Sequence, residues 1–300
     1  MPGTVKDLLP SFLEYLKFEK RYSSHTVVSY ETDLLQLDSY IFEVFGTMPV
    51  TEIPAPVLRS WLAKMKDANV NTRSINRKIS AVKSFYRFQL RKGVLVKNPA
   101  ALLKLMKTGK RLPGFLNEEV TEEIMHQNPS ENDWKAMTRS LLMEVLYNCG
   151  LRVSELVGLK EKHADLRLRQ IKVLGKGNKE RVIPVKPELA DHLREYMDRK
   201  RKTFEQFDAE YFFVNDKGLK LYTQYVYREV KEELAQYKNI AKKSPHLMRH
   251  TFATQLANNG ADLNAIKELL GHSSLAATQV YTHNTIEKLK DIHKKAHPKA

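Results

Sequence analysis

The stretch that decides the fold of the C-terminal half covers residues 169–185 and reads Arg-Gln-Ile-Lys-Val-Leu-Gly-Lys-Gly-Asn-Lys-Glu-Arg-Val-Ile-Pro-Val. Two short runs with apolar branched residues flank the segment from Gly175 to Lys179, where Gly and Asn supply the backbone angles of a tight turn. This pattern predicts an antiparallel β-hairpin. We expect a third strand at residues 211–214 to complete a small antiparallel sheet.

Helical patterns lie on both sides of the hairpin. Before it, Asn117 is placed to cap a helix through about residue 125. Ser130 is placed to cap a longer helix that reaches about residue 147 and stops at Gly150, and a short helix follows from Val153. After the hairpin, apolar spacings of three and four predict helices at about 222–238, 247–259, 262–270, 274–281 and 285–294.

The N-terminal half follows a helical pattern throughout residues 8–105. Apolar spacing and capping residues predict four helices, which begin near Leu8, at Ser23 or Ser24, near Leu58, and at Thr72 or Ser74. On the fourth helix we expect the basic side chains to face outward: Arg73, Arg77, Lys78, Lys83, Arg87 and Arg91. The first five of these are candidate DNA contacts, although a run of charges is also typical of a solvated helix face.

A basic stretch with Gly and Pro separates the two halves and predicts a linker at residues 106–113. We therefore expect a helical domain at residues 1–105 and a mixed domain at residues 114–300. The predicted fold class is mainly α, with a small antiparallel β-sheet in the second of two domains.

The charge balance favours nucleic acid as the partner. The chain carries a formal charge of +15, and residues 1–110 hold 18 Lys and Arg against 9 Asp and Glu, so that +9 lies there and +6 in the rest. A basic excess on both halves suits a polyanion gripped from two sides. Cys149 is the only cysteine, which excludes an internal disulfide. The sequence contains no signal-peptide pattern and no apolar run of roughly 18 residues, so we expect a cytoplasmic protein without a membrane segment.

Four segments carry side chains suited to phosphate chemistry. Arg152 follows a helix-stopping glycine at the start of the next helix, where a guanidinium and free amides can meet an anion. Lys176 lies at the predicted hairpin tip with Lys179 and Arg181 beside it, where a flexible cation can reach a DNA groove. Each of these features alone is also common on ordinary protein surfaces.

The other two segments lie further along the chain. His246, Arg249 and His250 are three and four residues apart, on one helical face. A zinc site is an alternative for two histidines at this spacing, but Leu247 stands where zinc-protease chemistry needs Glu, and Arg249 would repel a cation, so no metal is expected. In the last segment, His272 follows a glycine, and Tyr281 comes nine residues later.

Taken in this order, the segments resemble the active-site signature of the tyrosine recombinase (phage integrase) family, with none of its six positions altered: Arg152, Lys176, His246, Arg249, His272 and Tyr281. The resemblance is dense over residues 115–290. The helical layout of the first half and its phrase Ser24-His25-Thr26-Val27-Val28-Ser29-Tyr30 are similar to the family's SAM-like core-binding domain. The chain begins directly with that domain and ends soon after Tyr281, which is similar to the Xer-type recombinases that resolve chromosome dimers.

The resemblance implies a C-shaped DNA clamp that cuts and rejoins DNA through a 3′-phosphotyrosyl intermediate without ATP, metal or other cofactor. In that reading Tyr281 is the nucleophile, Arg152 and Arg249 bind the phosphate, and Lys176 is the general acid. His246 acts as acid and base, and His272 hydrogen-bonds the phosphate. Lys179 and Arg181 join the candidate DNA contacts.

The implied partners are a double-stranded recombination site and a homo- or hetero-tetramer with a second recombinase, with a C-terminal helix at about 286–293 packing on a neighbouring subunit. A DNA translocase is a candidate activator. Three alternatives stay open at this point: a mobile-element integrase, a non-catalytic DNA-binding protein on the same scaffold, and a relative of type IB topoisomerases.

Overall fold

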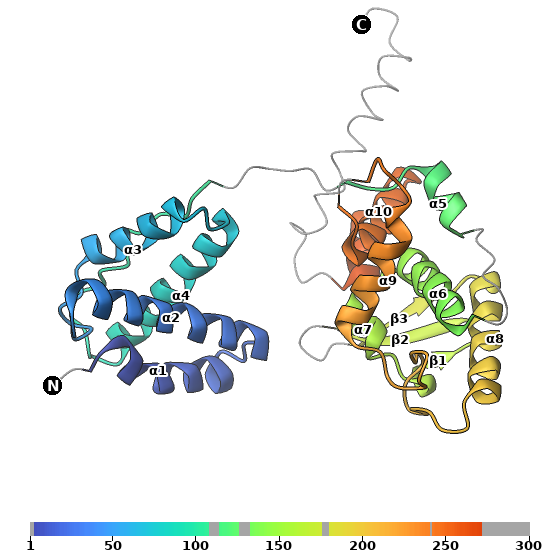
Figure 1. Ribbon diagram of the computed structural model, residues 1–300, viewed down its shortest axis with the longest axis horizontal. Helices are drawn as coiled ribbons and strands as arrows, with labels where there is room; N and C mark the ends of the chain where they lie inside the picture. Colours follow the sequence, from blue (N-terminus) through green and yellow to red (C-terminus); the bar gives the residue numbers. More distant parts are fainter. Residues whose placement is uncertain (1–2, 108–113, 126–132, 176–179, 241, 272–300) are drawn as a thin grey trace, which may run out of the picture. The chain divides into compact units, whose positions relative to one another are not determined.

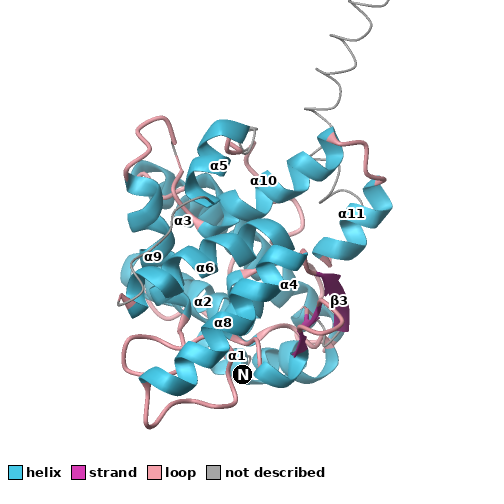
Figure 2. Ribbon diagram, turned by 90° about the vertical axis from the view of Figure 1, so that its right-hand side faces the viewer, coloured by secondary structure: helices cyan, strands magenta, loops and turns pink. Residues whose placement is uncertain are grey.

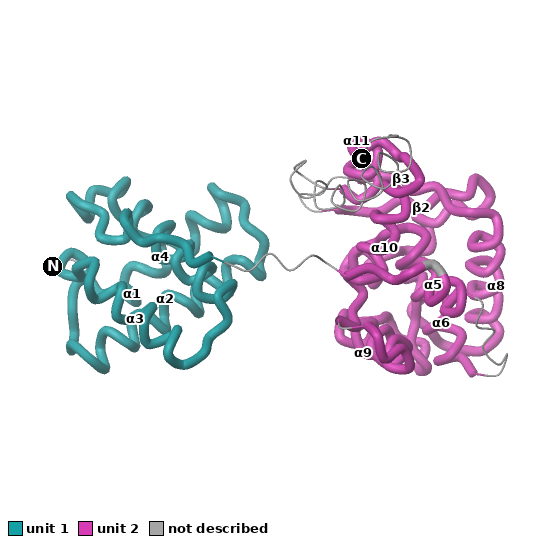
Figure 3. The backbone as a smooth tube through the Cα atoms, turned by 90° about the horizontal axis from the view of Figure 1, so that it is seen from above, with its two compact units in different colours: residues 1–110 teal, residues 111–300 magenta. Residues whose placement is uncertain are grey.

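The computed structural model describes residues 3–107, 114–125, 133–175, 180–240 and 242–271. The chain divides into two compact units, residues 1–110 and 111–300 (Figure 3). The first is built from helices, and the second combines helices with one small antiparallel sheet, which confirms the expected fold class (Figure 1). Within the described ranges, no helix has both the length and the apolar character needed to cross a membrane.

All four predicted helices of the first unit are present: α1 (Val5–Glu14), which continues into a π-helical turn (Tyr15–Glu19), α2 (Ser24–Phe45), α3 (Ala55–Asp67) and α4 (Thr72–Arg91). Helix α1 starts earlier than expected because Thr4 and Asp7 form a capping box that satisfies its first amides. The side chain of Ser23 accepts a hydrogen bond from the backbone of Thr26 and so caps α2 as predicted. Asn71 caps α4.

The core of the first unit is formed by one apolar face from each helix. Phe12, Leu34, Trp61 and Phe85 come from α1, α2, α3 and α4 in turn, and each is almost fully buried. The rings of Phe12 and Phe85 meet edge to face, with their centroids 5.5 Å apart. This packing leaves the opposite face of α4 to carry its basic residues.

One basic residue of α4 points inward. Lys78 is buried and donates to the carboxylate of Asp33 at 2.7 Å and to the side chain of Gln36, both on α2. Arg77 pairs with the same carboxylate at 2.6 Å. The prediction that Lys78 faces outward is wrong, because the fully buried Asp33 requires a cation beside it where α2 and α4 pack together.

The second unit contains seven described helices and a three-stranded sheet. The helices are α5 (Glu118–Met125), α6 (Trp134–Cys149), α7 (Val153–Val157), α8 (Pro187–Thr203), α9 (Thr223–Ala235), α10 (Pro245–Asn258) and α11 (Leu263–Leu270). The strands are β1 (Ala164–Asp165), β2 (Gln170–Leu174) and β3 (Glu180–Pro184), in the order β1-β2-β3. Strands β2 and β3 pair antiparallel, with Ile171 opposite Ile183, as the hairpin pattern predicts. The turn between them and the predicted helices after residue 272 lie outside the described residues.

The third strand is not where the sequence suggested. Residues 164–165 pair with β2, whereas the segment 211–214 makes only isolated bridges, Lys160 with Tyr211 and Val214 with Lys220. Phe212, Phe213 and Val214 are all buried in succession. A strand with one face toward solvent alternates between buried and exposed residues. These three residues are all buried, so the segment packs into the core as irregular structure.

Two further features of the second unit were missed. Helix α8 was not predicted, although Pro187 at its first turn and the buried Leu189, Leu193 and Tyr196 have helical spacing. Helix α6 is capped by Asp133, whose carboxylate accepts from the backbone of Ala136, and not by Ser130.

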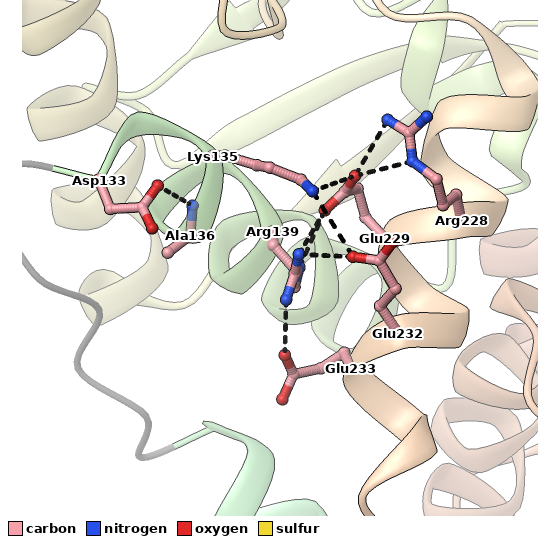
Figure 4. A network of polar contacts seen from close by, with 8 residues as sticks. All are labelled: Asp133, Lys135, Ala136, Arg139, Arg228, Glu229, Glu232 and Glu233. Atoms are coloured by element: carbon pink, nitrogen blue, oxygen red, sulfur yellow. Dashed lines mark hydrogen bonds and ion pairs between the residues drawn. The ribbon is translucent and has the colours of Figure 1, made fainter.

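Helix α6 lies at the centre of the second unit, packed by α5, α8, α9 and α10. A network of ion pairs joins α6 to α9 (Figure 4). The fully buried carboxylate of Glu229 accepts from Arg139 at 2.8 Å and lies 3.6 Å from Lys135 and 3.3 Å from Arg228. Because the buried charge is well paired, the network fixes α9 against the N-terminal half of α6.

Candidate active site

The site begins at the turn between α6 and α7. Gly150 ends α6 in the left-handed region, with φ of +58°. A Cβ atom there would lie 2.5 Å from Cδ1 of Phe252 on α10, so only glycine fits. This tight approach delivers Arg152 to the N-cap position of α7. Just before the turn, Cys149 is buried, and burial raises the pKa of its thiol to about 12, which makes it a structural residue.

The carboxylate of Glu155 is the hub of the site. Its Oε1 accepts from Nη1 of Arg152 and from Nη1 of Arg181, both at 2.8 Å. Its Oε2 accepts from Nη2 of Arg181 at 2.9 Å and from the backbone amide of Arg152 at 2.8 Å. Burial would raise the pKa of Glu155, but hydrogen bonds from Arg181 and Arg152 outweigh it and hold the pKa below its usual value. The group is therefore an anion at neutral pH.

Arg249 enters the same site from α10. Its side chain is buried, with Nη1 donating to the Gly150 carbonyl and Nη2 to the Leu270 carbonyl, each at 2.6 Å. Nη1 also lies 3.9 Å from Oε2 of Glu155. The structure thus brings together Arg152 and Arg249, the two residues that the resemblance predicts to bind the phosphate.

The C-terminal end of α11 closes the site beside β3 (Figure 2). The carbonyls of its last two residues and of its C-cap, Gly271, are each taken by a different arginine. Arg181 Nε donates to Leu269 at 2.7 Å, Arg249 Nη2 to Leu270, and Arg152 Nη2 to Gly271 at 2.9 Å. Cations suit a helix C-terminus because the carbonyls there carry partial negative charge.

Two histidines of α10 face this cationic group. Loss of solvent contact, together with Lys242, Arg249 and Arg152, lowers the pKa of His246 below its ordinary value, although the residue as a whole is exposed. Loss of solvent contact, His246, Arg249 and Lys242 lower the pKa of His250 in the same direction. Both rings are therefore neutral at pH 7. Among the residues that the structure describes, no group of three or more His, Cys, Asp or Glu could hold a metal ion.

The remaining candidates divide into three sets. Arg73 and Arg87 are exposed on α4, and Lys83 is partly exposed. Lys78 and Arg181 turn inward to Asp33 and Glu155, and Arg77 is partly engaged with Asp33. Four predicted site residues lie outside the described residues: Lys176, Lys179, His272 and Tyr281.

Comparison with known proteins covers both units. Residues 114–288 match the phage integrase family, and residues 9–93 match the phage integrase N-terminal SAM-like domain. Tyrosine recombinase XerC of Chlorobaculum tepidum is 35% identical over 317 residues, which cover 97% of this chain and 94% of that protein. Tyrosine recombinase XerC of Bacillus licheniformis is 36% identical over 301 residues, covering 99% and 98%.

A solved structure shares the fold as well. The Tn1549 transposon integrase in complex with transposon right end DNA superposes with a TM-score of 0.75 at 21% identity, covering 97% of this chain and 99% of that one. Likeness at this identity concerns the fold alone, whereas the two sequence relatives extend over nearly the whole chain. This chain belongs to the phage integrase family, and it is a tyrosine recombinase, an enzyme that cuts and rejoins DNA.

Proposed function

We propose that the chain acts in site-specific recombination that resolves chromosome dimers, with its DNA-binding domain at residues 1–105 and its catalytic domain at residues 114–300. The observation that carries the proposal is the meeting of Arg152 and Arg249 at the Glu155 carboxylate, within a chain about 35% identical to XerC recombinases over nearly its full length. Such relatives favour the chromosomal role over that of a mobile-element integrase.

The two arginines would bind the scissile phosphodiester. Each guanidinium Nη carries two N–H groups, so one can stay on a protein oxygen while the other donates to a non-bridging phosphate oxygen. Preorganised donors of this kind stabilise the charge that develops on phosphorus and cost no reorganisation during the reaction. The partly exposed Arg152 offers the more open approach, and the buried Arg249 the more rigid one.

Tyr281 would attack the phosphorus, forming a 3′-phosphotyrosyl bond and releasing a 5′-hydroxyl. Lys176 would protonate the leaving 5′ oxygen, a step worth roughly a hundred- to ten-thousand-fold in rate. His272 would hydrogen-bond the phosphate. Because the covalent link conserves the energy of the broken bond, religation needs neither ATP nor a metal.

His246 suits the role of general base for Tyr281. Its lowered pKa keeps the ring neutral at pH 7, and a neutral imidazole can accept the phenolic proton. A free tyrosine has a pKa near 10, so removal of its proton at neutral pH needs such a base or a strongly cationic site.

DNA affinity would come mainly from phosphate contacts by both domains closing as a clamp, including Arg73, Lys83 and Arg87 on α4 and Lys179 at the hairpin. Contacts of this kind make binding fall steeply with salt, and loss of one phosphate contact reduces the slope by about one. We expect Arg73→Ala and Arg87→Ala each to reduce the slope of DNA affinity against salt concentration by about one. Lys64→Ala on α3 removes the same charge and serves as the control. A flat salt response in the wild type would contradict the clamp.

The assembly on DNA would be a homo- or hetero-tetramer with a second recombinase, acting in the cytoplasm where chromosomal DNA lies. The segment after residue 285 would pack on a neighbouring subunit, and a DNA translocase is the proposed activator. Deleting residues after 285 should spare DNA binding and abolish synapsis. Unchanged tetramer assembly in the truncated chain would exclude this arrangement.

A nicked suicide substrate that carries candidate chromosomal recombination sites tests the chemistry. We expect a covalent protein–DNA adduct with the wild type and none with Tyr281→Phe. An adduct with both proteins would mean that another tyrosine is the nucleophile. Absence of an adduct with either, on DNA that is demonstrably bound, would leave the non-catalytic alternative or a missing partner recombinase.

A further inference from the structure

Arg181 of β3 uses its whole guanidinium inside the protein. Nη1 and Nη2 form a two-pronged contact with the Glu155 carboxylate at 2.8 and 2.9 Å, and Nε donates to the Leu269 carbonyl at 2.7 Å. Only 12% of the side chain is exposed. All three nitrogens of Arg181 therefore join groups of the protein to one another, which suits a residue that holds these groups in place.

We propose that Arg181 is a positioning residue for strand cleavage, which holds Glu155, the end of α11 and the hairpin strand β3 in one fixed arrangement. The inference rests on the function proposed above. It assigns to Arg181 an indirect role, through the groups it holds, and no contact with the scissile phosphate.

The first group held in place is Arg152. Glu155 accepts from both the side chain and the backbone amide of Arg152 while Arg181 occupies the remaining positions of the same carboxylate. Without Arg181, the Glu155 carboxylate would retain its contacts with Arg152 and, at a longer distance, with Arg249. The plane of the carboxylate could then rotate. The planar fork of Arg181 therefore fixes the carboxylate that in turn orients the clamp.

The second group is the end of α11, directly before His272. Arg181 holds the Leu269 carbonyl, and a Cβ atom at Gly271 would lie 3.1 Å from Nη1 of Arg181. Gly271 itself adopts φ of +62°. This close approach ties Leu269 and Gly271, which precede His272 in the sequence, to β3. The side chain of Arg181 thus connects β3, which follows Lys176 in the sequence, with α11, which precedes His272 and Tyr281.

Lysine cannot reproduce this arrangement, because a single ammonium cannot bridge both carboxylate oxygens and the Leu269 carbonyl in one plane. Arg181→Lys therefore keeps the charge and removes the geometry, while Arg181→Met removes both. Arg201→Met is the matched control, because it removes a partly exposed arginine of α8 from its ion pair with Glu161.

The test is single-turnover cleavage of the nicked suicide substrate as a function of pH, together with DNA affinity. Misplacement of catalytic groups by about 1 Å costs on the order of 100-fold in rate, so we expect a fall of this size in Arg181→Lys and a larger one in Arg181→Met, with DNA affinity nearly unchanged. Loss of the Arg181 hydrogen bonds raises the pKa of Glu155, so the acid limb of the profile should move to higher pH. Arg201→Met should match the wild type.

Three results would overturn the inference. Cleavage at the wild-type rate in both variants would show that the arrangement does not depend on Arg181. A fall in cleavage matched by an equal fall in DNA affinity would make Arg181 a DNA contact. An unmoved acid limb would reduce its role to general stability. A wild type that forms no adduct on bound DNA overturns the proposed function and this inference together, whereas an active wild type beside equally active variants overturns the inference alone.

Discussion

Gly150 offers the sharpest test of how the turn before Arg152 is built. We predict that Gly150→Ala destabilises the second unit and disables cleavage. Alanine at φ of +58° costs about 1–2 kcal/mol on steric grounds. The new Cβ would also lie 2.5 Å from Cδ1 of Phe252 and 3.1 Å from Cδ2 of Leu270, an overpacking worth about 1–3 kcal/mol. The two effects together give about 2–5 kcal/mol.

Gly260 provides the matched control. It has φ of +84° in the same unit, but nothing lies within 4 Å of the position of its Cβ. Gly260→Ala should therefore show only the backbone cost of about 1–2 kcal/mol. Any stabilisation from the stiffer unfolded chain is common to both variants and cancels in the comparison.

Tryptophan fluorescence separates the two units in this experiment, because the sequence contains two tryptophans, Trp61 and Trp134, one in each unit. In a Trp61→Phe background, urea unfolding followed at Trp134 reports the second unit. Equal losses of unfolding free energy in Gly150→Ala and Gly260→Ala would refute the packing argument. Partial rescue of Gly150→Ala by Phe252→Ala, which removes the ring atoms in conflict, would support it.

Three other outcomes are expected. Lys78→Ala should lower the free energy of unfolding of the first unit by about 1–3 kcal/mol, because the buried Asp33 loses one of its donors. Urea unfolding followed at Trp61 measures this change, and an unchanged free energy of unfolding would contradict the inward placement of Lys78. Glu229→Gln should cost the second unit a similar amount by weakening the pairs that hold α9 to α6, and unchanged unfolding would mean that the network contributes nothing. His246 and His250 have lowered pKa values in the folded protein, so the unfolded chain binds more protons just below pH 6.5. The free energy of unfolding should therefore decrease as the pH is lowered through this range. Replacing both histidines with Gln should make the free energy of unfolding less dependent on pH there.

Local patterns predicted most of the elements and failed where long-range packing decides. The four helices of the first unit and the β2–β3 hairpin follow from apolar spacing and turn residues, which act over a few positions. The segment 211–214 has a composition typical of a strand, yet it fills the core beside α8 as irregular structure. Nothing within that segment indicates that β1 takes the available edge of β2.

The sequence shows which residues are basic, but not whether their side chains point into the protein or toward solvent. Lys78 is buried because Asp33 lies on the facing helix, a pairing between residues far apart in sequence. Arg181 is different, since a signal was present. Residues two apart in a strand face the same side, and Ile183 is buried, so Arg181 shares the inner face of β3.

The charge of the completed site explains why it suits a phosphodiester. Three guanidinium groups meet one carboxylate, because Arg152, Arg181 and Arg249 surround Glu155. Two positive charges therefore remain uncompensated among these four groups, at a place with little contact with water, where charge interactions are strong. Loss of solvent contact, together with the charges of Lys242, Arg249 and Arg152, lowers the pKa of His246. An anion that enters the site supplies the missing charge, and a phosphodiester also offers two non-bridging oxygens that can accept hydrogen bonds from the arginines.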